Sequence, residues 1–169
     1  MKCPHSEICG VCSWINLPLE EQKQRKLQSL KQSLEAAGIQ IPETISLTLP
    51  SESHIRDRVD LIFSKGHYGF YKKSEKDIFP IEECPQMSSE LYSFFTELKK
   101  IPIPIKKGSL RLRIAPPDLQ TAPVASSLAK PSKGLWLDFA NTDVQLLFEE
   151  KKTLHQLTEL AFVEIGQRK

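Results

Sequence analysis

Apolar and polar residues alternate along several segments of the chain, a pattern typical of strands with one buried face. In residues 56–64, Val59, Leu61 and Phe63 share one face, while Arg58 and Asp60 share the other. A turn at 65–67 would join this strand to a partner and form a hairpin. Further extended segments are predicted at 44–49, 68–73, 77–81, 101–105, 109–115 and 135–139.

Helical periodicity appears in other segments. Residues 19–37 place Leu27, Leu30 and Leu34 on one face, and Gly38 can close that helix. Ser88 or Ser89 is a suitable N-cap for a helix that runs to about residue 100. Two shorter helices are predicted over 141–150 and 153–160, a loop over 116–133, and either a strand or a loose tail over 163–169.

This order of elements predicts an α+β fold, with an antiparallel β-sheet flanked by helices and a metal-binding loop at the N-terminus. We expect one domain over residues 1–169. It would consist of a cysteine loop at 1–16, a helix at 17–38 and an α+β body at 39–169.

Composition sets only broad limits on function. The 169 residues are 40% hydrophobic and 26% charged, as in a soluble globular protein, and the net charge of +2 is too small to indicate nucleic-acid binding by itself. The chain has no apolar run of about 18 residues and no signal-peptide pattern, so we expect a cytoplasmic protein without membrane association. In a reducing compartment, four cysteines favour metal binding or catalysis over disulfides.

The cysteines form a three-plus-one arrangement. Five residues separate Cys3 from Cys9, two separate Cys9 from Cys12, and Cys84 is the only other cysteine in the sequence. Four cysteine ligands suit either a zinc ion or an iron–sulfur cluster. All-cysteine zinc sites usually comprise two close pairs, so three close cysteines plus a distant Cys-Pro favour a cluster, with zinc left open. Ligation by Cys84 would tie the N-terminal loop to the hairpin region.

The motifs around these cysteines resemble a known family. Cys3-x5-Cys9-Gly10-Val11-Cys12 is followed by a glutamine-rich helix, Ile55-Arg56-Asp57-Arg58-Val59, Gly69-Phe70-Tyr71-Lys72-Lys73 and Cys84-Pro85. Together, over residues 3 to about 91, they resemble the central domain of RNA (uracil-5)-methyltransferases, on the RumA-like iron–sulfur branch. Val11 departs from the family's second glycine, and His54-Ile55 stands where an aromatic residue is usual.

The resemblance implies a [4Fe–4S] cluster on Cys3, Cys9, Cys12 and Cys84. It also implies RNA recognition in a protein whose other domains carry catalysis. The family's methylation uses a further cysteine thiolate, which adds to the uracil ring. With all four cysteines assigned as ligands and no glycine-rich cofactor loop, we expect no catalytic residue here and no S-adenosylmethionine binding to this chain. The N-terminal TRAM domain and the catalytic methyltransferase domain are expected to be absent from it.

Basic residues follow the predicted strands and would contact RNA phosphates if those strands are neighbours. The candidates are Arg56, Arg58, Lys72, Lys73, Arg111 and Arg113. Tyr68, Phe70 and Tyr71 are candidates for stacking on an unpaired base. The alternative interpretation of each arginine is a salt bridge, since acidic residues such as Asp57 and Asp60 are close in the sequence.

These observations support two interpretations of function. The first is a monomeric, iron–sulfur-containing RNA-binding domain that recognises a loop of rRNA or tRNA, with a catalytic domain supplied in cis or in trans. The alternative is a stand-alone four-cysteine module, with zinc or a cluster, that mediates interactions outside any methyltransferase.

Overall fold

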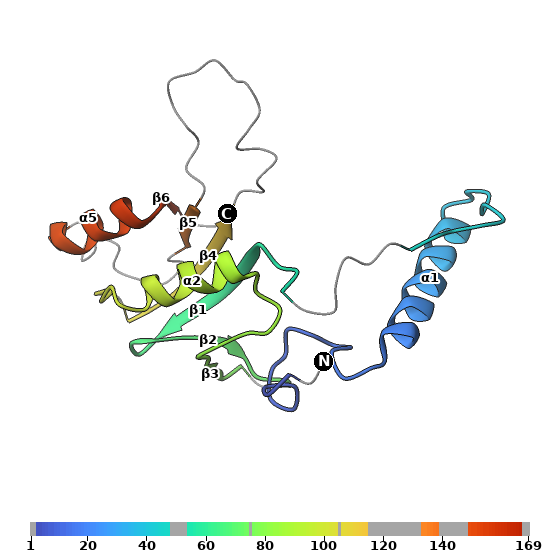
Figure 1. The fold of residues 1–169 in the computed structure, drawn as a ribbon, viewed down its shortest axis with the longest axis horizontal. Helices are drawn as coiled ribbons and strands as arrows, with labels where there is room; N and C mark the ends of the chain where they lie inside the picture. Colours follow the sequence, from blue (N-terminus) through green and yellow to red (C-terminus); the bar gives the residue numbers. More distant parts are fainter. Residues whose placement is uncertain are drawn as a thin grey trace, which may run out of the picture.

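The computed structural model describes residues 3–47, 54–74, 76–104, 106–114, 133–138 and 149–166, and the fold is given for these residues. Its body is a six-stranded sheet in the order β3-β2-β1-β4-β5-β6 (Figure 1). The strands are β1 (Arg58–Ser64), β2 (His67–Tyr71), β3 (Ile78–Pro80), β4 (Lys107–Ile114), β5 (Lys133–Asp138) and β6 (Phe162–Gly166). The helices are α1 (Leu19–Ala36), α2 (Ser89–Leu98) and α5 (Lys151–Leu160). The predicted α+β class is confirmed.

Alternation in the strands produces a sheet with one buried face. Val59, Leu61 and Phe63 of β1 are 4%, 0% and 3% exposed, as their spacing predicts. They lie beside the inward residues of β4 and β5 because the register pairs Val59 with Leu112 and Leu61 with Leu110. The other members of this layer are Tyr68, Phe70, Phe79, Ile114, Leu135 and Leu137.

Helix α2 covers the buried face. Ser88 caps it by accepting a hydrogen bond from the backbone N–H of Leu91, as predicted for a serine at this position. The helix buries Leu91, Phe94, Phe95 and Leu98 completely, and each such side chain contributes about 1.5–3 kcal/mol of transfer free energy. Helix α5 packs on the same side and joins this core through Leu157. The opposite face of the sheet therefore has no helix over it within the described residues (Figure 1).

The sheet is mixed, which corrects the predicted all-antiparallel sheet. β6 runs parallel to β5, with Leu135 opposite Val163 and Leu137 opposite Ile165. The chain reaches β6 through α5, and a helical crossover is the usual way to bring a strand into parallel pairing. Residues 162–166 are therefore a strand, the first of the two alternatives for this end of the chain.

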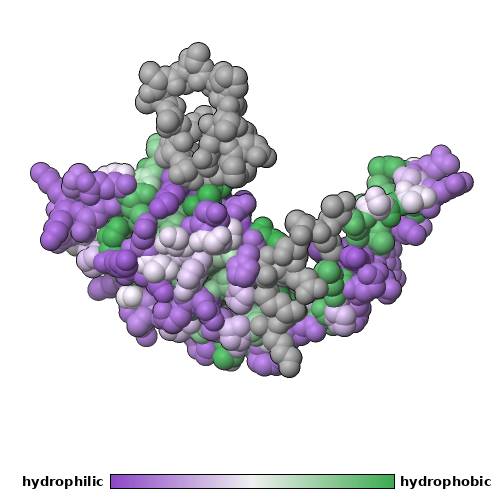
Figure 2. Space-filling model, in the orientation of Figure 1, coloured by the Kyte–Doolittle hydropathy of each residue, from purple (hydrophilic) through white to green (hydrophobic). Residues whose placement is uncertain are grey.

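Helix α1 does not flank the sheet. None of its residues is buried, and Leu30 on the predicted apolar face is 41% exposed. Figure 1 shows α1 apart from the body, and Figure 2 shows it as a projecting arm with mixed hydrophobic and hydrophilic surface. Periodicity predicted the helix and its end at Gly38, which has a φ of +68°. It could not show whether another element packs against the leucines of this helix. None of the helices among the described residues has the length and apolar character needed to cross a membrane.

Three other predictions have different outcomes. Residues 44–47 form no strand, because no neighbouring strand pairs with them, and 48–49 lie outside the described residues. The loop predicted over 116–133 lies outside them as far as residue 132, and Lys133 begins β5. The helix predicted over 141–150 also lies outside them, except for its last two residues.

Candidate functional site

The N-terminal cysteine loop is fastened to the end of β2 by backbone pairing. Cys9 and Lys72 form an antiparallel bridge. On either side of it, the N–H of Gly10 donates to the carbonyl oxygen of Tyr71 (3.1 Å), and the N–H of Lys73 donates to that of Ile8 (2.8 Å). The loop thus has a defined place against the hairpin, although it contributes few apolar side chains.

Gly10 permits this close approach. A Cβ atom at this position would lie 3.1 Å from the carbonyl oxygen of Tyr71 and 3.3 Å from that of Lys72. Both neighbours are backbone atoms held in the pairing, so they have little freedom to move away. Glycine is therefore the residue that suits this position in the Cys-Gly-x-Cys motif, and Val11 at the next position is 39% exposed and meets no such restriction.

Cys84 reaches the same region from a turn that precedes α2. The N–H of Met87 donates to the carbonyl oxygen of Cys84 (3.0 Å), which closes the turn. Arg56 pairs with Met87 in a parallel bridge, and its N–H donates to the carbonyl oxygen of Gln86 (2.8 Å). The chain just before β1 thereby holds the Cys84 turn in place.

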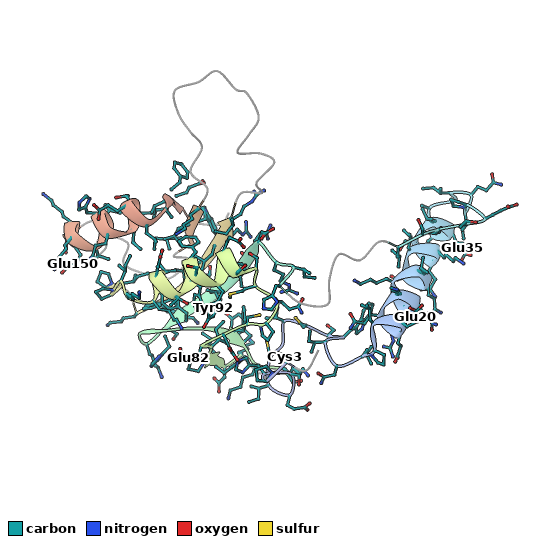
Figure 3. All side chains as sticks on the ribbon, viewed as in Figure 1. Cys3, Glu20, Glu35, Glu82, Tyr92 and Glu150 are labelled. Atoms are coloured by element: carbon teal, nitrogen blue, oxygen red, sulfur yellow. The ribbon has the colours of Figure 1, made fainter. Side chains whose placement is uncertain are left out.

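The four cysteines line one hollow. Val11, Ile15 and Phe70 supply apolar walls. Figure 3 shows Cys3 at the lower edge of the body, and Glu20 and Glu35 on the separate helix α1. Cys3, Cys9, Cys12 and Cys84 are each half-buried with a free thiol. The structure therefore brings together the four cysteines that the spacing singled out.

The electrostatics of this hollow favour the neutral thiol at Cys9 and at Cys84. Burial raises the pKa of Cys9 and of Cys84, and the neighbouring thiols Cys12 and Cys3 raise both further. Hydrogen bonds from the backbone at Val11 and Gln86 act in the opposite direction at Cys9 and Cys84, respectively. Backbone donors directed at thiolate sulfur are the kind of interaction that stabilises metal-bound cysteines.

Arg56 belongs to this hollow. Its Nη2 donates to Sγ of Cys12 (3.5 Å), and its charge lowers the pKa of Cys9 and Cys84. Arg56 and Arg58, both candidates for RNA contact by their alternating positions, are separated in the structure, because β1 begins only at Arg58 and residue 56 pairs with Met87 instead. Strict alternation does not extend past the end of a strand.

His5 also lines the hollow. Its Nε2 is buried and has no hydrogen-bond partner among the described residues, while the centre of its ring lies 5.6 Å from that of Phe79. A buried donor or acceptor without a partner is costly, at about 1–3 kcal/mol.

The hollow gathers thiols that belong to distant parts of the chain. As they stand, His, Cys, Asp and Glu side chains form no group of three or more that would hold one metal ion anywhere in the described ranges. The four cysteines line it, and backbone donors and the Arg56 guanidinium lie beside them. Soft thiolates of this kind are ligands of zinc ions and of iron–sulfur clusters.

The other arginines lie on the open face of the sheet. Arg58 pairs in register with Arg113, and Asp60 pairs with Arg111. Asp60 accepts from Arg111 Nε (2.6 Å) and from Arg58 Nη2 (3.1 Å). Burial alone would raise the pKa of Asp60, but these two guanidinium groups outweigh it and hold that pKa below its ordinary value. The structure thus confirms that the strands of Arg58 and Arg111 are neighbours. It also confirms the alternative interpretation for these two arginines, since each forms a salt bridge with Asp60.

Lys72 and Lys73 occupy a different place. Lys72 lies opposite Cys9 and forms a 3.7 Å ion pair with Asp77. The Nζ of Lys73 donates to the backbone carbonyl of Ser6. Both lysines therefore support the cysteine loop, rather than extending the row of arginines on β1 and β4.

The three aromatic candidates for base stacking differ in exposure. Tyr68 and Phe70 are 6% and 4% exposed and pack in the core, so a stacking role for them is wrong, whereas Tyr71 is 45% exposed. The open face presents two aromatic residues that sequence analysis did not select. Trp136 lies beneath Arg111, 5.6 Å from its guanidinium carbon, and Phe162 is 60% exposed. Alternation in Phe162-Val163-Glu164-Ile165 was an available signal for Phe162.

Comparison with known proteins gives the chain a context. It is 35% identical over 167 residues to an uncharacterized RNA methyltransferase of Bdellovibrio bacteriovorus, covering 99% of this chain and 40% of that protein. A 23S rRNA (uracil(1939)-C(5))-methyltransferase, RlmD, of Vibrio parahaemolyticus is 32% identical over 111 residues, covering 62% and 25%. The relatives of this chain are RNA methyltransferases. A third, a tRNA/tmRNA (uracil-C(5))-methyltransferase of Nautilia profundicola, is 28% identical over 106 residues, or 59% of this chain and 28% of that protein.

The similarity to these RNA methyltransferases is partial in extent. The chain spans two fifths of the length of the Bdellovibrio protein and about a quarter of the other two. No family model matches the chain.

Proposed function

We propose that this chain is an iron–sulfur-containing RNA-binding domain of an RNA (uracil-5)-methyltransferase. The observation that carries the proposal is the meeting of Cys3, Cys9, Cys12 and Cys84 at one hollow, in a chain whose relatives are RNA methyltransferases. The proposed partner is a loop of rRNA or tRNA. Because all four cysteines of these 169 residues are proposed ligands, we assign the methylating thiolate and S-adenosylmethionine binding to residues outside them.

The proposed role of the hollow is architectural. A [4Fe–4S] cluster would supply four iron–thiolate bonds that join residues 3–12 to residue 84. Arg56 would offset negative charge at Cys12, and the backbone at Val11 and Gln86 would hydrogen-bond the sulfurs. Without this ligation the loop is held mainly by its short backbone pairing with the end of β2.

Anaerobic purification tests the metal assignment. A cluster gives a brown protein with a broad visible absorption band and about four iron and four sulfide per chain. A colourless protein with one zinc per chain would overturn the cluster and favour the alternative, a four-cysteine interaction module.

Replacing both Arg58 and Arg113 with alanine tests the RNA face. Loss of two phosphate contacts should weaken RNA binding and reduce the magnitude of the slope of log K against log salt by about 1.4 for single-stranded RNA. Fluorescence anisotropy over a range of salt concentrations measures both quantities. The matched control is Lys26 and Lys31 replaced with alanine on α1, which removes the same charge far from the sheet. An equal effect of both double variants would count against a localised RNA site.

Asp60→Asn provides a test in the opposite direction. This carboxylate accepts hydrogen bonds from Arg58 and Arg111. Its neutralisation leaves both guanidinium groups more available to phosphate, so RNA affinity should rise and the salt slope should steepen. An unchanged slope would mean that neither arginine contacts phosphate.

Replacing Arg56 with alanine tests the proposed support of the cluster. A hydrogen bond to a charged group contributes about 1.5–3 kcal/mol, and removal of a cation beside the cluster disfavours the more negative, reduced state. The variant should therefore release iron faster to a chelator and show a lower reduction potential. Potentiometric titration and chelator kinetics measure these changes. Arg25→Ala, on α1, is the control, and indistinguishable values for the two variants would remove Arg56 from the site.

A further inference from the structure

The open face of the sheet contains a row of cross-strand neighbours that joins two arginines to an exposed aromatic ring. Arg58 of β1 is paired with Arg113 of β4. Arg113 is in turn paired with Gly134 of β5, and Gly134 with Phe162 of β6. Residues paired in register point to the same side of a sheet. The row therefore runs from basic to aromatic across four strands and ends at the edge of the sheet.

Gly134 leaves space beside the ring of Phe162. Among the described residues, a Cβ atom built at Gly134 would meet only the carbonyl oxygen of Arg113, at 3.9 Å. Gly134 itself therefore places no side chain in the row between Arg113 and Phe162. With Phe162 60% exposed, a flat group can approach its ring from the direction of Gly134.

The next row along the strands has a related composition. It pairs Asp60 with Arg111, Arg111 with Trp136, and Trp136 with Glu164. The guanidinium of Arg111 lies over the indole of Trp136. Over both rows the charged residues are three arginines and two carboxylates. The net charge is positive, and the row of Phe162 contains no carboxylate.

We propose that this face binds a single-stranded segment of RNA, with an unpaired base stacked on Phe162 and the adjacent phosphates held by Arg113 and Arg58. The inference rests on the proposed function, because it assumes that the chain binds RNA. It specifies the kind of RNA and the residues that bind it. Stacking needs an exposed π face on both partners, and bases in a duplex already stack on each other. An exposed phenylalanine in one row with two arginines therefore selects unpaired nucleotides.

Phe162→Leu is the main test. Leucine keeps an apolar residue in the edge strand but removes the aromatic ring. Stacking on one aromatic side chain contributes enough that its loss should weaken binding of a short oligouridylate about 5- to 100-fold. The salt slope should stay unchanged, because no charge is lost. By contrast, Arg113→Ala should reduce the magnitude of that slope by about 0.7.

Two further variants serve as controls for the loss of the ring. Phe162→Trp keeps a stacking ring and should retain binding. Tyr92→Leu removes an aromatic residue that is 41% exposed on α2, on the other side of the sheet, and should have no effect (Figure 3). Circular dichroism and urea unfolding of each variant verify that the fold persists.

The probe RNAs separate failure of the inference from failure of the proposed function. The same oligouridylate with abasic sites should bind the wild-type chain as weakly as the intact strand binds Phe162→Leu. If the wild-type chain binds RNA and both Phe162→Leu and Phe162→Trp bind it with the same affinity as the wild type, stacking on Phe162 is overturned and RNA binding stands. If duplex RNA binds as tightly as the single strand, the preference for unpaired nucleotides is overturned. If the wild-type chain binds neither probe at any salt concentration, the proposed function fails as well.

Discussion

Replacing Cys84 with serine is expected to abolish iron binding and to release the N-terminal loop, while the sheet remains folded. Cys84 is the one proposed ligand outside residues 3–12, so its loss removes the link between that loop and the turn before α2. Closing a loop of this length stabilises a chain by about 4 kcal/mol or more in the chain-entropy treatment of a cross-link. The visible absorption band should disappear, and hydrogen exchange should increase across residues 3–16.

Ser6→Ala is the matched control, because Ser6 lines the same hollow without a thiol. This variant should retain iron, and its residues 3–16 should remain protected from hydrogen exchange. Removal of the metal from the wild-type chain with a chelator should reproduce the exchange pattern of Cys84→Ser. Equal protection of residues 3–16 with and without metal would show that ligation does not hold this loop, and would contradict the architectural role.

Replacing Gly69 with alanine is expected to destabilise the hairpin severely. A Cβ atom at Gly69 would lie 2.1 Å from the carbonyl oxygen of Phe79 and 2.8 Å from Cγ2 of Ile78. Gly69 pairs with Pro80 and Ile62 in the centre of β3-β2-β1, so relief of this clash requires β3 to move away from β2. We expect a loss of about 3 kcal/mol or more in the free energy of unfolding, at the upper end for overpacking.

Gly134→Ala serves as the control for Gly69→Ala in the same sheet. Its Cβ has only the 3.9 Å neighbour, which is an ordinary contact, so stability should change by less than about 1 kcal/mol. Urea unfolding followed by circular dichroism compares the two variants. Because Phe70 of β2 lines the cysteine hollow, Gly69→Ala should also lose iron more readily than Gly134→Ala. If the two variants unfolded at the same urea concentration, β3 would not pack on β2 as described.

Much of the fold follows from local patterns. Alternation placed Val59, Leu61 and Phe63 inward, and the serine before α2 predicted its cap, because both features depend on neighbours in the sequence. Cysteine spacing likewise selected the four residues that meet at the hollow.

The remaining features depend on pairing between distant segments. The contacts between distant segments decide three features. They decide whether another element covers Leu30, whether β6 runs parallel to β5, and how far β1 extends. This is why Arg56 was assigned to the RNA face with Arg58 yet contacts Cys12, and why Phe162 was not selected.

The sequence by itself determined helix α2, the alternation of β1, the buried face and the set of four cysteines. It could do so because periodicity and capping act within a few residues. Only the tertiary structure decided that the four cysteines line one hollow, that Arg56 contacts Cys12 there, and that Arg58, Arg113 and Phe162 share one open row. The physical reason is that strand register is set by backbone hydrogen bonds and side-chain packing between segments distant in the sequence, such as those of Arg58 and Arg113.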